Sequence, residues 1–268
     1  MQLPKTMNLI LPVISTLARR ASAGDISPST TEFHLENVPP KTVSRYLKVL
    51  ALGREHLPLS FYYLFAQRAH IAQMISPSFP FPVLGMIHLS NEMESFKEVK
   101  LSQRFVLSST ISQLENCIYF AVDFKQDGEI VMTCKSTYLI ANRKSKSERV
   151  TATKNEEAEF DYFCEVDLES GDGRKYAIAS GDFNFIHLHP LLAKVFGFKK
   201  AIIHGMFMCA KVNGLIEQSL EKPIKYFKIE FKKPIFLPSK VLIKSKHGHF
   251  QVTSNKDDRL HLFGEYKV

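Results

Sequence analysis

The 268-residue sequence predicts an α+β protein made of two halves. Three observations support this prediction. A polar segment divides the chain near residue 150, a long helix followed by a run of strands is expected after it, and parts of the first half resemble parts of the second. A helix that precedes several consecutive strands is typical of α+β folds, in which the two kinds of element are segregated.

The N-terminal segment 7–18 is apolar, and we expect it to form an amphipathic helix that belongs to the fold. A secretory signal is the alternative, because residues 21–23 read Ala-Ser-Ala, like a cleavage site. Arg19 and Arg20 follow the apolar run and Pro12 interrupts it, which argues against a signal. No run in the sequence approaches the roughly 18 apolar residues that a transmembrane helix needs, so no membrane span is expected.

A linker is predicted at residues 142–159, which contain one valine and otherwise only small, polar or charged side chains. Such a segment cannot bury a core. The predicted domains are therefore an N-terminal domain over residues 1–141 and a C-terminal domain over residues 160–268.

The C-terminal half shows clear element signals. Residues 160–166 are rich in aromatic and branched side chains and predict a strand, whereas 174–182 predicts a short helix or turn that ends at Gly181. Apolar residues at helical spacing predict a long buried helix over 204–220. Four further strands are predicted, over 224–236, 241–246, 249–254 and 259–268.

An internal repeat relates the two halves. The segment 81–93, which contains His88, resembles the segment 198–210, which contains His204. Placing the two histidines opposite each other gives an offset of 116 residues, and a second matching pair of segments has an offset of about 129. The second half thus has about 13 extra residues where its long helix lies. We therefore expect the N-terminal helix to be degenerate, with residues 61–86 lining a tunnel instead of packing on a helix. The alternative is that these residues form an ordinary core, with the gap closed by side-chain packing. At the first offset, Ala66 and Ile71 stand opposite the reactive residues of the second half, which predicts one reactive site per chain.

Charge and cysteine content limit the partners and the compartment. The net charge is +8, but the basic residues are spread over several segments, whereas nucleic-acid proteins concentrate them on one element. We therefore expect no nucleic-acid partner, although a mildly basic surface attracts phosphate-bearing molecules. The four cysteines are scattered without a C-x-x-C motif, which favours free thiols in the reducing cytoplasm.

The stretch from 180 to 206 gathers three histidines, an aspartate and an asparagine among apolar residues. Two interpretations follow from the residues alone. The spacing of His187 and His189 matches the opening of a cupin metal motif, with His204 as a further ligand, but the glutamate expected four or five positions after His189 is absent. Alternatively, the histidines are satisfied core residues and the aspartate caps a helix.

The same stretch resembles the hydratase 2 motif of the MaoC-like dehydratases, which favours acid–base chemistry. The matching residues are Tyr176, Ala177, Ser180, Gly181, Asp182, Asn184, Ile186 and His187, followed by Ala193, Gly197, Phe198, Ile202, His204, Gly205 and Met206. Segments 57–66 and 79–89 also resemble the degenerate N-terminal half of two-domain members. One departure is Phe185, where the family usually has a proline that would stiffen the loop.

The resemblance implies a double hotdog fold, with two antiparallel sheets each wrapped on a helix. It also implies a hydro-lyase of fatty-acid metabolism, which hydrates trans-2-enoyl thioesters or dehydrates (R)-3-hydroxyacyl thioesters. The substrate would be an acyl-CoA or an acyl carrier protein thioester, and no cofactor or metal is expected. A cytoplasmic location and a possible homodimer complete the expectation.

The resemblance also implies residue roles. Asp182 and His187 would hold a water molecule between them and act as acid and base. Gly205, at the start of the long helix, would offer its backbone N–H to the developing negative charge on the thioester oxygen. The remaining members of the predicted substrate-binding set are Asn184, His204, Ser180 and Tyr176. A non-catalytic acyl-thioester-binding protein is the alternative, and Phe185 is the residue that favours it.

Overall fold

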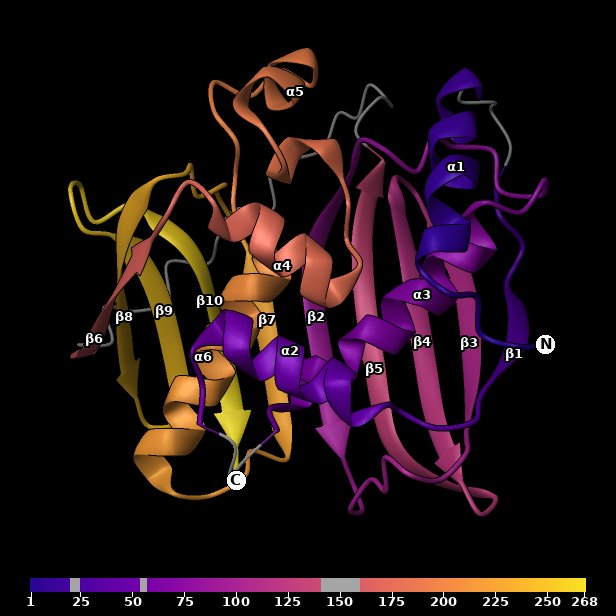
Figure 1. Ribbon diagram of the computed structural model, residues 1–268, viewed down its shortest axis with the longest axis horizontal. Helices are drawn as coiled ribbons and strands as arrows, with labels where there is room; N and C mark the ends of the chain where they lie inside the picture. Colours follow the sequence, from indigo (N-terminus) through magenta and orange to yellow (C-terminus); the bar gives the residue numbers. More distant parts are fainter. Residues whose placement is uncertain (20–24, 54–56, 141–159) are drawn as a thin grey trace.

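The computed structural model describes residues 1–19, 25–53, 57–140 and 160–268. Ten antiparallel strands form one sheet in the order β1-β3-β4-β5-β2-β7-β10-β9-β8-β6, and α2, α3, α4 and α6 lie over one face of it (Figure 1). The α+β class is therefore confirmed. The predicted linker at 142–159 lies outside the described residues, and the division into domains at 1–141 and 160–268 stays a prediction.

The first half contributes five strands and most of the small helices. Its elements are α1 (Met7–Ser15), η1 (Thr16–Ala18), β1 (Ser29–Leu35), α2 (Pro40–Leu50), η2 (Leu59–Phe61), α3 (Tyr63–Met74), β2 (Met86–Ser95), β3 (Phe105–Leu114), β4 (Cys117–Gln126) and β5 (Glu129–Ile140). The predicted N-terminal helix is confirmed, and Pro12 lies inside it without ending it.

The second half repeats this order with a longer principal helix. Its elements are β6 (Asp161–Leu168), α4 (Asp172–Ser180), η3 (Phe185–His187), α5 (Pro190–Val195), α6 (Gly205–Leu220), β7 (Tyr226–Phe231), β8 (Ser239–Lys246), β9 (His249–Ser254) and β10 (Leu260–Lys267). The helices and strands predicted for this half are thus confirmed.

The two halves mirror each other in the sheet. Outward from the centre, the order β2-β5-β4-β3-β1 in the first half corresponds to β7-β10-β9-β8-β6 in the second. The halves meet where β2 pairs with β7, for example Asn91 with Ile229 and Met93 with Phe227. Two predicted sheets are therefore one sheet, because this pairing satisfies the backbone groups that both edges would otherwise leave open.

The first of the two repeat alignments is wrong. Residues 89–93, which it matched to the start of the long helix, belong to strand β2, and the first-half counterpart of α6 is α3. The N-terminal helix is therefore shorter, with 12 residues against 16, but it is present. Residues 63–74 thus form helix α3. The expectation that the segment 61–86 lines a tunnel for the substrate stays a prediction, and the cavity described below is lined from this segment by Tyr63, Gln67, His70, Ile71, Met74, Val83, Leu84 and Met86. The error arose because an apolar run before a histidine occurs both in a buried strand and at the start of a buried helix.

Alternating burial shows how the sequence forms the sheet. In β3, Phe105, Leu107, Ser109 and Ile111 are buried, and the residues between them are partly exposed. The inward side chains pack under the helices in a core that includes residues of both halves. Among the described residues, no helix is long and apolar enough to cross a membrane.

Candidate active site

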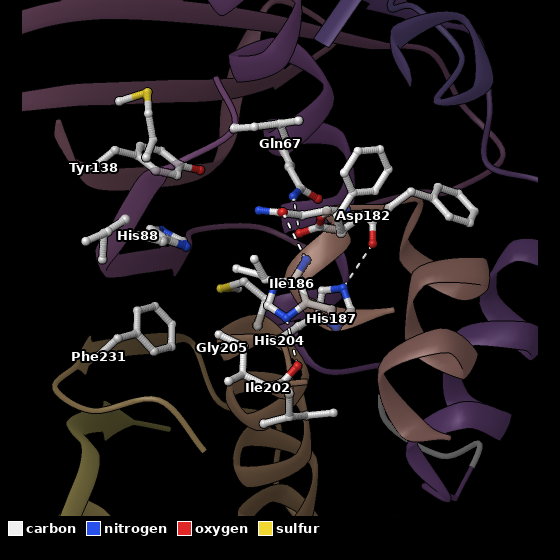
Figure 2. A pocket seen from close by; sticks show the side chains of 18 of the residues that line it. Gln67, His88, Tyr138, Asp182, Ile186, His187, Ile202, His204, Gly205 and Phe231 are labelled. Carbon is white, nitrogen blue, oxygen red and sulfur yellow. Dashed lines mark hydrogen bonds between the residues drawn. The ribbon is translucent and has the colours of Figure 1, made fainter. Parts of the chain in front are cut away.

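A cavity of about 450 Å³ lies where the two halves meet (Figure 2). Residues 181–187 and the first turn of α6 line it from the second half, and α1, α3 and the start of β2 line it from the first. Its apolar wall includes Leu9, Ile10 and Val13 of α1. An apolar cavity with a few convergent polar groups is the usual form of a small-molecule site.

The end of α4 positions the reactive loop. Gly181 terminates the helix in the left-handed region at φ 85°, where glycine carries no steric cost. A Cβ at this position would lie 2.5 Å from the side chain of Thr6. The glycine thus allows the chain to turn sharply beneath the N-terminal segment, and Asp182 follows the turn directly.

Asp182 is partly buried, and the hydrogen bonds around it fix its carboxylate. Asn184 donates its backbone N–H to Oδ1 at 3.1 Å, and Gln67 donates from Nε2 to Oδ2 at 2.8 Å. The backbone carbonyl of Asp182 accepts a third hydrogen bond, from His204 Nε2 at 2.9 Å. Both carboxylate oxygens of Asp182 are therefore held in place, and each keeps a lone pair that can accept a further hydrogen bond.

His187 is oriented as a proton acceptor. Its Nδ1 lies 2.9 Å from the carbonyl oxygen of Ile202. Since a carbonyl only accepts, Nδ1 carries the proton, and the neutral ring keeps a lone pair on Nε2. Nε2 of the imidazole can therefore accept a hydrogen bond or a proton.

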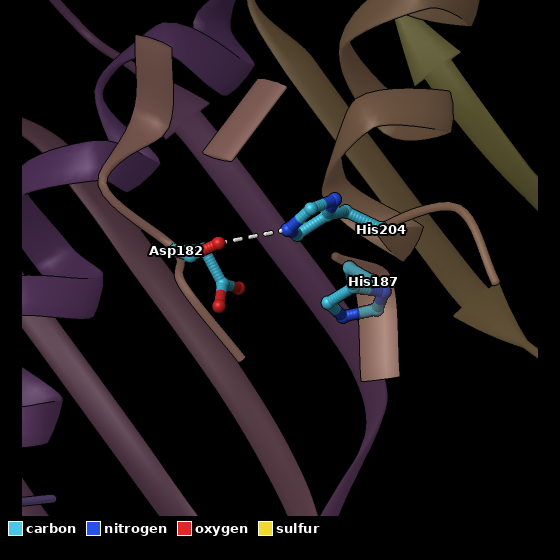
Figure 3. A group of neighbouring side chains, drawn as sticks. All are labelled: Asp182, His187 and His204. Atoms are coloured by element: carbon cyan, nitrogen blue, oxygen red, sulfur yellow. Dashed lines mark hydrogen bonds between the residues drawn. The ribbon is translucent and has the colours of Figure 1, made fainter. Parts of the chain in front are cut away.

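His204 caps α6 and supports the other two residues. Its ring stacks on His187 with centroids 3.7 Å apart and an interplanar angle of 26°. Because Nε2 donates to Asp182, the lone pair of the neutral ring is on Nδ1, which is buried without a partner among the described residues. His204 therefore contacts both Asp182 and His187 and fixes the position of each relative to the other (Figure 3).

The protonation states follow from opposing effects. Burial raises the pKa of Asp182, but the neighbouring His204 and His187 and the hydrogen bonds from Gln67 and Asn184 lower it, and the net direction is downward. Burial, followed by the repulsion of His204, lowers the pKa of His187 to about 3 despite the attraction of Asp182. At neutral pH the site therefore holds an ionised aspartate beside neutral imidazoles.

The spacing of these groups suits a bridging water. Ligand atoms of Asp182, His187 and His204 all lie within 4.8 Å of one another. A water that makes two hydrogen bonds of about 2.8 Å at a tetrahedral angle joins atoms about 4.6 Å apart. The same spacing would also allow a metal ion, for which each ring has one nitrogen left, because His204 Nε2 donates to the Asp182 carbonyl and His187 Nδ1 to that of Ile202. His189, the other histidine of the predicted metal motif, is exposed and caps α5 instead.

Gly205 begins α6 and lines the cavity, as the sequence predicted. Neither Gly205 nor Met206 donates its backbone N–H to another described residue. These two N–H groups belong to the first turn of a 16-residue helix, where the helix dipole has its positive end. A negative charge that develops there is stabilised. A Cβ at Gly205 would lie 2.7 Å from the ring of Phe231, so the glycine also makes room for close packing.

Asn184 organises the loop. Its Oδ1 accepts from the backbone N–H of Ile186 at 3.5 Å and so caps the short helix η3. Phe185 is the first residue of η3, at the position of the family proline, and its ring lies 6.4 Å from that of Phe196. The loop thus forms with phenylalanine at this position, and Asp182 and His187 still face each other.

Ser180 and Tyr176 do not line the cavity. Ser180 Oγ donates to the carbonyl of Tyr176 at 2.8 Å and accepts from the backbone N–H of Asp182 at 3.1 Å. The ring of Tyr176 is buried against those of His204 and Phe207. Both side chains therefore lie behind the reactive residues and support them.

The first half contributes polar groups that the sequence did not reveal. Besides Gln67, the cavity is lined by Tyr63, His70, His88 and Tyr138. The hydroxyl of Tyr138 is hydrogen-bonded to the hydroxyl of Tyr63 and to Nδ1 of His70, and its ring stacks on His88. The hydroxyls of Tyr63 and Tyr138 lie 2.7 Å apart. The only sequence signal was the presence of polar residues in an apolar helix and strand, which by itself does not show which cavity they face.

Comparison with known proteins agrees with this geometry. Residues 147–259 match the family model described as the MaoC like domain. The chain is 25% identical over 236 residues to 3-hydroxyacyl-thioester dehydratase X of Mycobacterium tuberculosis, covering 82% of this chain and 84% of that enzyme. It is 30% identical over 87 residues to the (R)-specific enoyl-CoA hydratase of Aeromonas caviae, covering 31% of this chain and 61% of that enzyme.

Solved structures share the whole fold. The crystal structure of HtdX from Mycobacterium tuberculosis superposes with a TM-score of 0.75 at 20% identity, covering 90% of this chain and 99% of that one. A MaoC-like dehydratase from Phytophthora capsici gives a TM-score of 0.64 at 14% identity, covering 95% and 97% of the two chains. The predicted hotdog architecture is therefore confirmed across both halves.

Proposed function

The chain carries a MaoC-like domain over residues 147–259, and from this premise we propose that it is an (R)-specific hydro-lyase. The reaction is the reversible addition of water across the C2=C3 bond of a trans-2-enoyl thioester, which yields an (R)-3-hydroxyacyl thioester. The observation that carries the proposal is the Asp182 carboxylate beside the His187 imidazole, with one potential ligand atom of each within 4.8 Å of the other, at the wall of an apolar cavity. The related dehydratase and hydratase point to the same class of reaction.

The substrate's acyl chain lies in the apolar cavity and its thioester carbonyl faces the start of α6. Burial of the chain against α1 and α3 contributes about 0.8 kcal/mol for each methylene removed from water. The backbone N–H groups of Gly205 and Met206 receive the carbonyl oxygen. Their hydrogen bonds strengthen as negative charge develops on that oxygen, so they stabilise the enolate-like transition state more than the ground state.

A single water molecule supplies both the hydroxyl group and the proton. The water lies between the carboxylate of Asp182 and Nε2 of His187, and its oxygen bonds to C3 while one of its protons passes to the dyad. At neutral pH neither the Asp182 carboxylate nor Nε2 of His187 carries a proton, and the Nδ1 proton of His187 is held by the Ile202 carbonyl. The proton taken from water is therefore the one delivered to C2. Dehydration is the reverse: the dyad takes the C2 proton and returns it to the departing hydroxyl.

The positions of the remaining residues suit this mechanism. His204 holds the Asp182 carbonyl and the His187 ring together, and Ser180 holds the Asp182 backbone. Asn184 shapes the loop through its cap and its N–H. We propose these as positioning roles. The substrate contacts first predicted for Ser180 and Tyr176 are replaced in this proposal by support from behind the cavity wall.

The carrier of the acyl group is coenzyme A or acyl carrier protein. Lys232 and Lys233 follow β7 and line the cavity, where their ammonium groups favour a phosphate-bearing carrier. All four cysteines are free, which suits a reducing compartment, and we propose the cytoplasm. A homodimer is also proposed, and light scattering would reveal it as twice the 30.6 kDa chain mass.

The decisive test is hydration of crotonyl-CoA and longer trans-2-enoyl-CoAs, followed as loss of enoyl absorbance. We expect turnover with the (R)-3-hydroxyacyl product, identified by chiral chromatography. Phe185 at the family proline position favours a second candidate, an acyl-thioester-binding protein without turnover. Calorimetric binding of an acyl-CoA with no hydration by the same preparation would establish that candidate, and metal analysis of the protein would detect a metalloprotein.

A further inference from the structure

We propose that Gln67, a residue of the first half, is a positioning residue that completes the active site of the second half. It lies on α3, 115 residues before Asp182 in the chain, and its amide reaches across the cavity to the Asp182 carboxylate (Figure 2). The first half then acts in the reaction through Asp182. The expected effect of Gln67 on the reaction rate rests on the proposed function. The hydrogen bond between Gln67 and Asp182 does not, because it can be tested without turnover.

The two oxygens of the carboxylate are held from different halves of the chain. Oδ1 accepts from the backbone of Asn184, which belongs to the same loop and moves with it. Oδ2 accepts from Gln67 Nε2 at 2.8 Å. Only the second bond fixes the carboxylate relative to the opposite wall of the cavity. Without it, the group could rotate away from the water that it shares with His187.

Helix α3 is anchored firmly enough to serve this purpose. At its start, the hydroxyl of Tyr63 lies 2.7 Å from that of Tyr138 on β5. Arg68, the next residue after Gln67, donates to the carbonyls of Pro4 and Leu3 in the N-terminal segment. Hydrogen bonds thus connect the helix on both sides of Gln67 to other segments, β5 on one side and residues 3–4 on the other. The Gln67 amide is therefore held in a fixed position.

The bond also favours the charged form of the aspartate. An amide N–H that points at a carboxylate stabilises the ion and not the neutral acid, so Gln67 lowers the pKa of Asp182 alongside the histidines and Asn184. Removing the Gln67 amide should therefore raise the pKa of Asp182 toward the pH range of the hydration assay. The other titratable groups that act on Asp182 are His187, His204, His88, Tyr63, Tyr138 and Tyr176.

Gln73 provides a matched control on the same helix. It is buried, and its amide exchanges hydrogen bonds with Ser109 of β3, away from the cavity. Gln67→Met and Gln73→Met remove the same amide and keep a similar side-chain shape. A general loss of stability affects both variants, whereas an effect on Asp182 affects only the first. Gln67→Asn keeps an amide but withdraws it by one methylene, and it serves if the methionine variant fails to fold.

The primary measurement is the pH titration of the Asp182 carboxyl carbon by ¹³C NMR, with the resonance assigned by its loss in Asp182→Asn. We expect the midpoint to rise in Gln67→Met and Gln67→Asn and to stay unchanged in Gln73→Met. In the hydration assay we expect Gln67→Met to lower kcat/KM about tenfold at pH 5 and less at pH 8, through kcat and not KM.

The outcomes separate the possible failures. An unchanged titration midpoint in both Gln67 variants would overturn the inference, as would a rise in KM alone, since Gln67 would then bind substrate directly. A native protein without hydratase activity would refute the proposed function. The titration would still decide whether Gln67 controls the Asp182 carboxylate.

Discussion

Replacing Asp182 with asparagine tests the mechanism with little change of shape. The substitution removes one negative charge and the proton-accepting oxygen, while an amide oxygen can still accept the 3.1 Å hydrogen bond from the backbone of Asn184. The new NH₂ group then faces Gln67, whose amide must turn over to offer its oxygen in place of Nε2. The hydrogen-bond count is conserved, and we therefore expect Asp182→Asn to fold with a melting temperature close to that of the native protein.

The rate should fall sharply because the water loses one of its two acceptors. A positioned general acid or base contributes a factor of about 10² to 10⁴, which corresponds to about 3 to 5 kcal/mol of transition-state stabilisation. The carboxylate also stabilises the imidazolium that forms on His187, and its loss removes this attraction as well. We expect kcat for crotonyl-CoA to decrease at least about 100-fold, with a small change in KM, and His187→Ala to show a loss of the same order.

His189→Ala is the matched control for the histidine variant. His189 lies two positions from His187 but is exposed and accepts the backbone N–H of Leu191 at the start of α5. Its removal should leave kcat within about twofold of native, since surface substitutions change stability little. Near-native turnover in Asp182→Asn or His187→Ala, with circular dichroism showing an intact fold, would remove the dyad assignment.

Three further predictions concern other parts of the molecule. Gly205→Val places a side chain 2.7 Å from Phe231, and we expect kcat to fall more than KM rises, whereas a change in KM alone would mean that Gly205 only makes room for packing. The cavity of about 450 Å³ is within the usual size range for ligand sites, so kcat/KM should hold or rise beyond C8 across C4 to C16 enoyl-CoAs, and a collapse beyond C6 would contradict this. Burial raises the pKa of Glu217 from 4.5 to about 7. Between these two pH values the folded protein keeps a proton that the unfolded chain has lost. The free energy of unfolding should therefore fall as the pH rises through this window. Melting temperatures at pH 5 and pH 8 should therefore differ less in Glu217→Gln than in the native protein, and an equal difference would show that Glu217 is not responsible.

Local signals in the sequence were sufficient for the elements of the second half. The apolar spacing over 204–220 identified α6, and the alternation of side chains identified β7 to β10. Gly181 was recognised as the end of a helix because a left-handed residue there is a local requirement of the backbone. The spacing of Asp182 and His187 also suffices to bring them close together, since His187 ends the short helix η3, which begins three residues after Asp182.

Long-range pairing decided the rest. Strand β2 and the first turns of α6 look alike as apolar runs that include a histidine, and only the partners available in the sheet distinguish them. The contact between Gln67 and Asp182 spans 115 residues and depends on β2 pairing with β7, which brings α3 to the cavity. The direction of the Asp182 pKa shift depends on the same assembly, because burial and the surrounding donors oppose each other.

The sequence by itself thus predicted Asp182 and His187 as the candidate reactive pair, and it determined the long helix and the strands of the second half, because spacing along the chain controls both. The tertiary structure decided what those residues can do. The neighbouring His204 and His187 and the amide of Gln67 all lower the pKa of Asp182, and Gln67 reaches it only because the two halves join into one sheet. The physical reason is that hydrogen bonds and electrostatic interactions act through space, between residues whose distance along the chain carries no information about their contact.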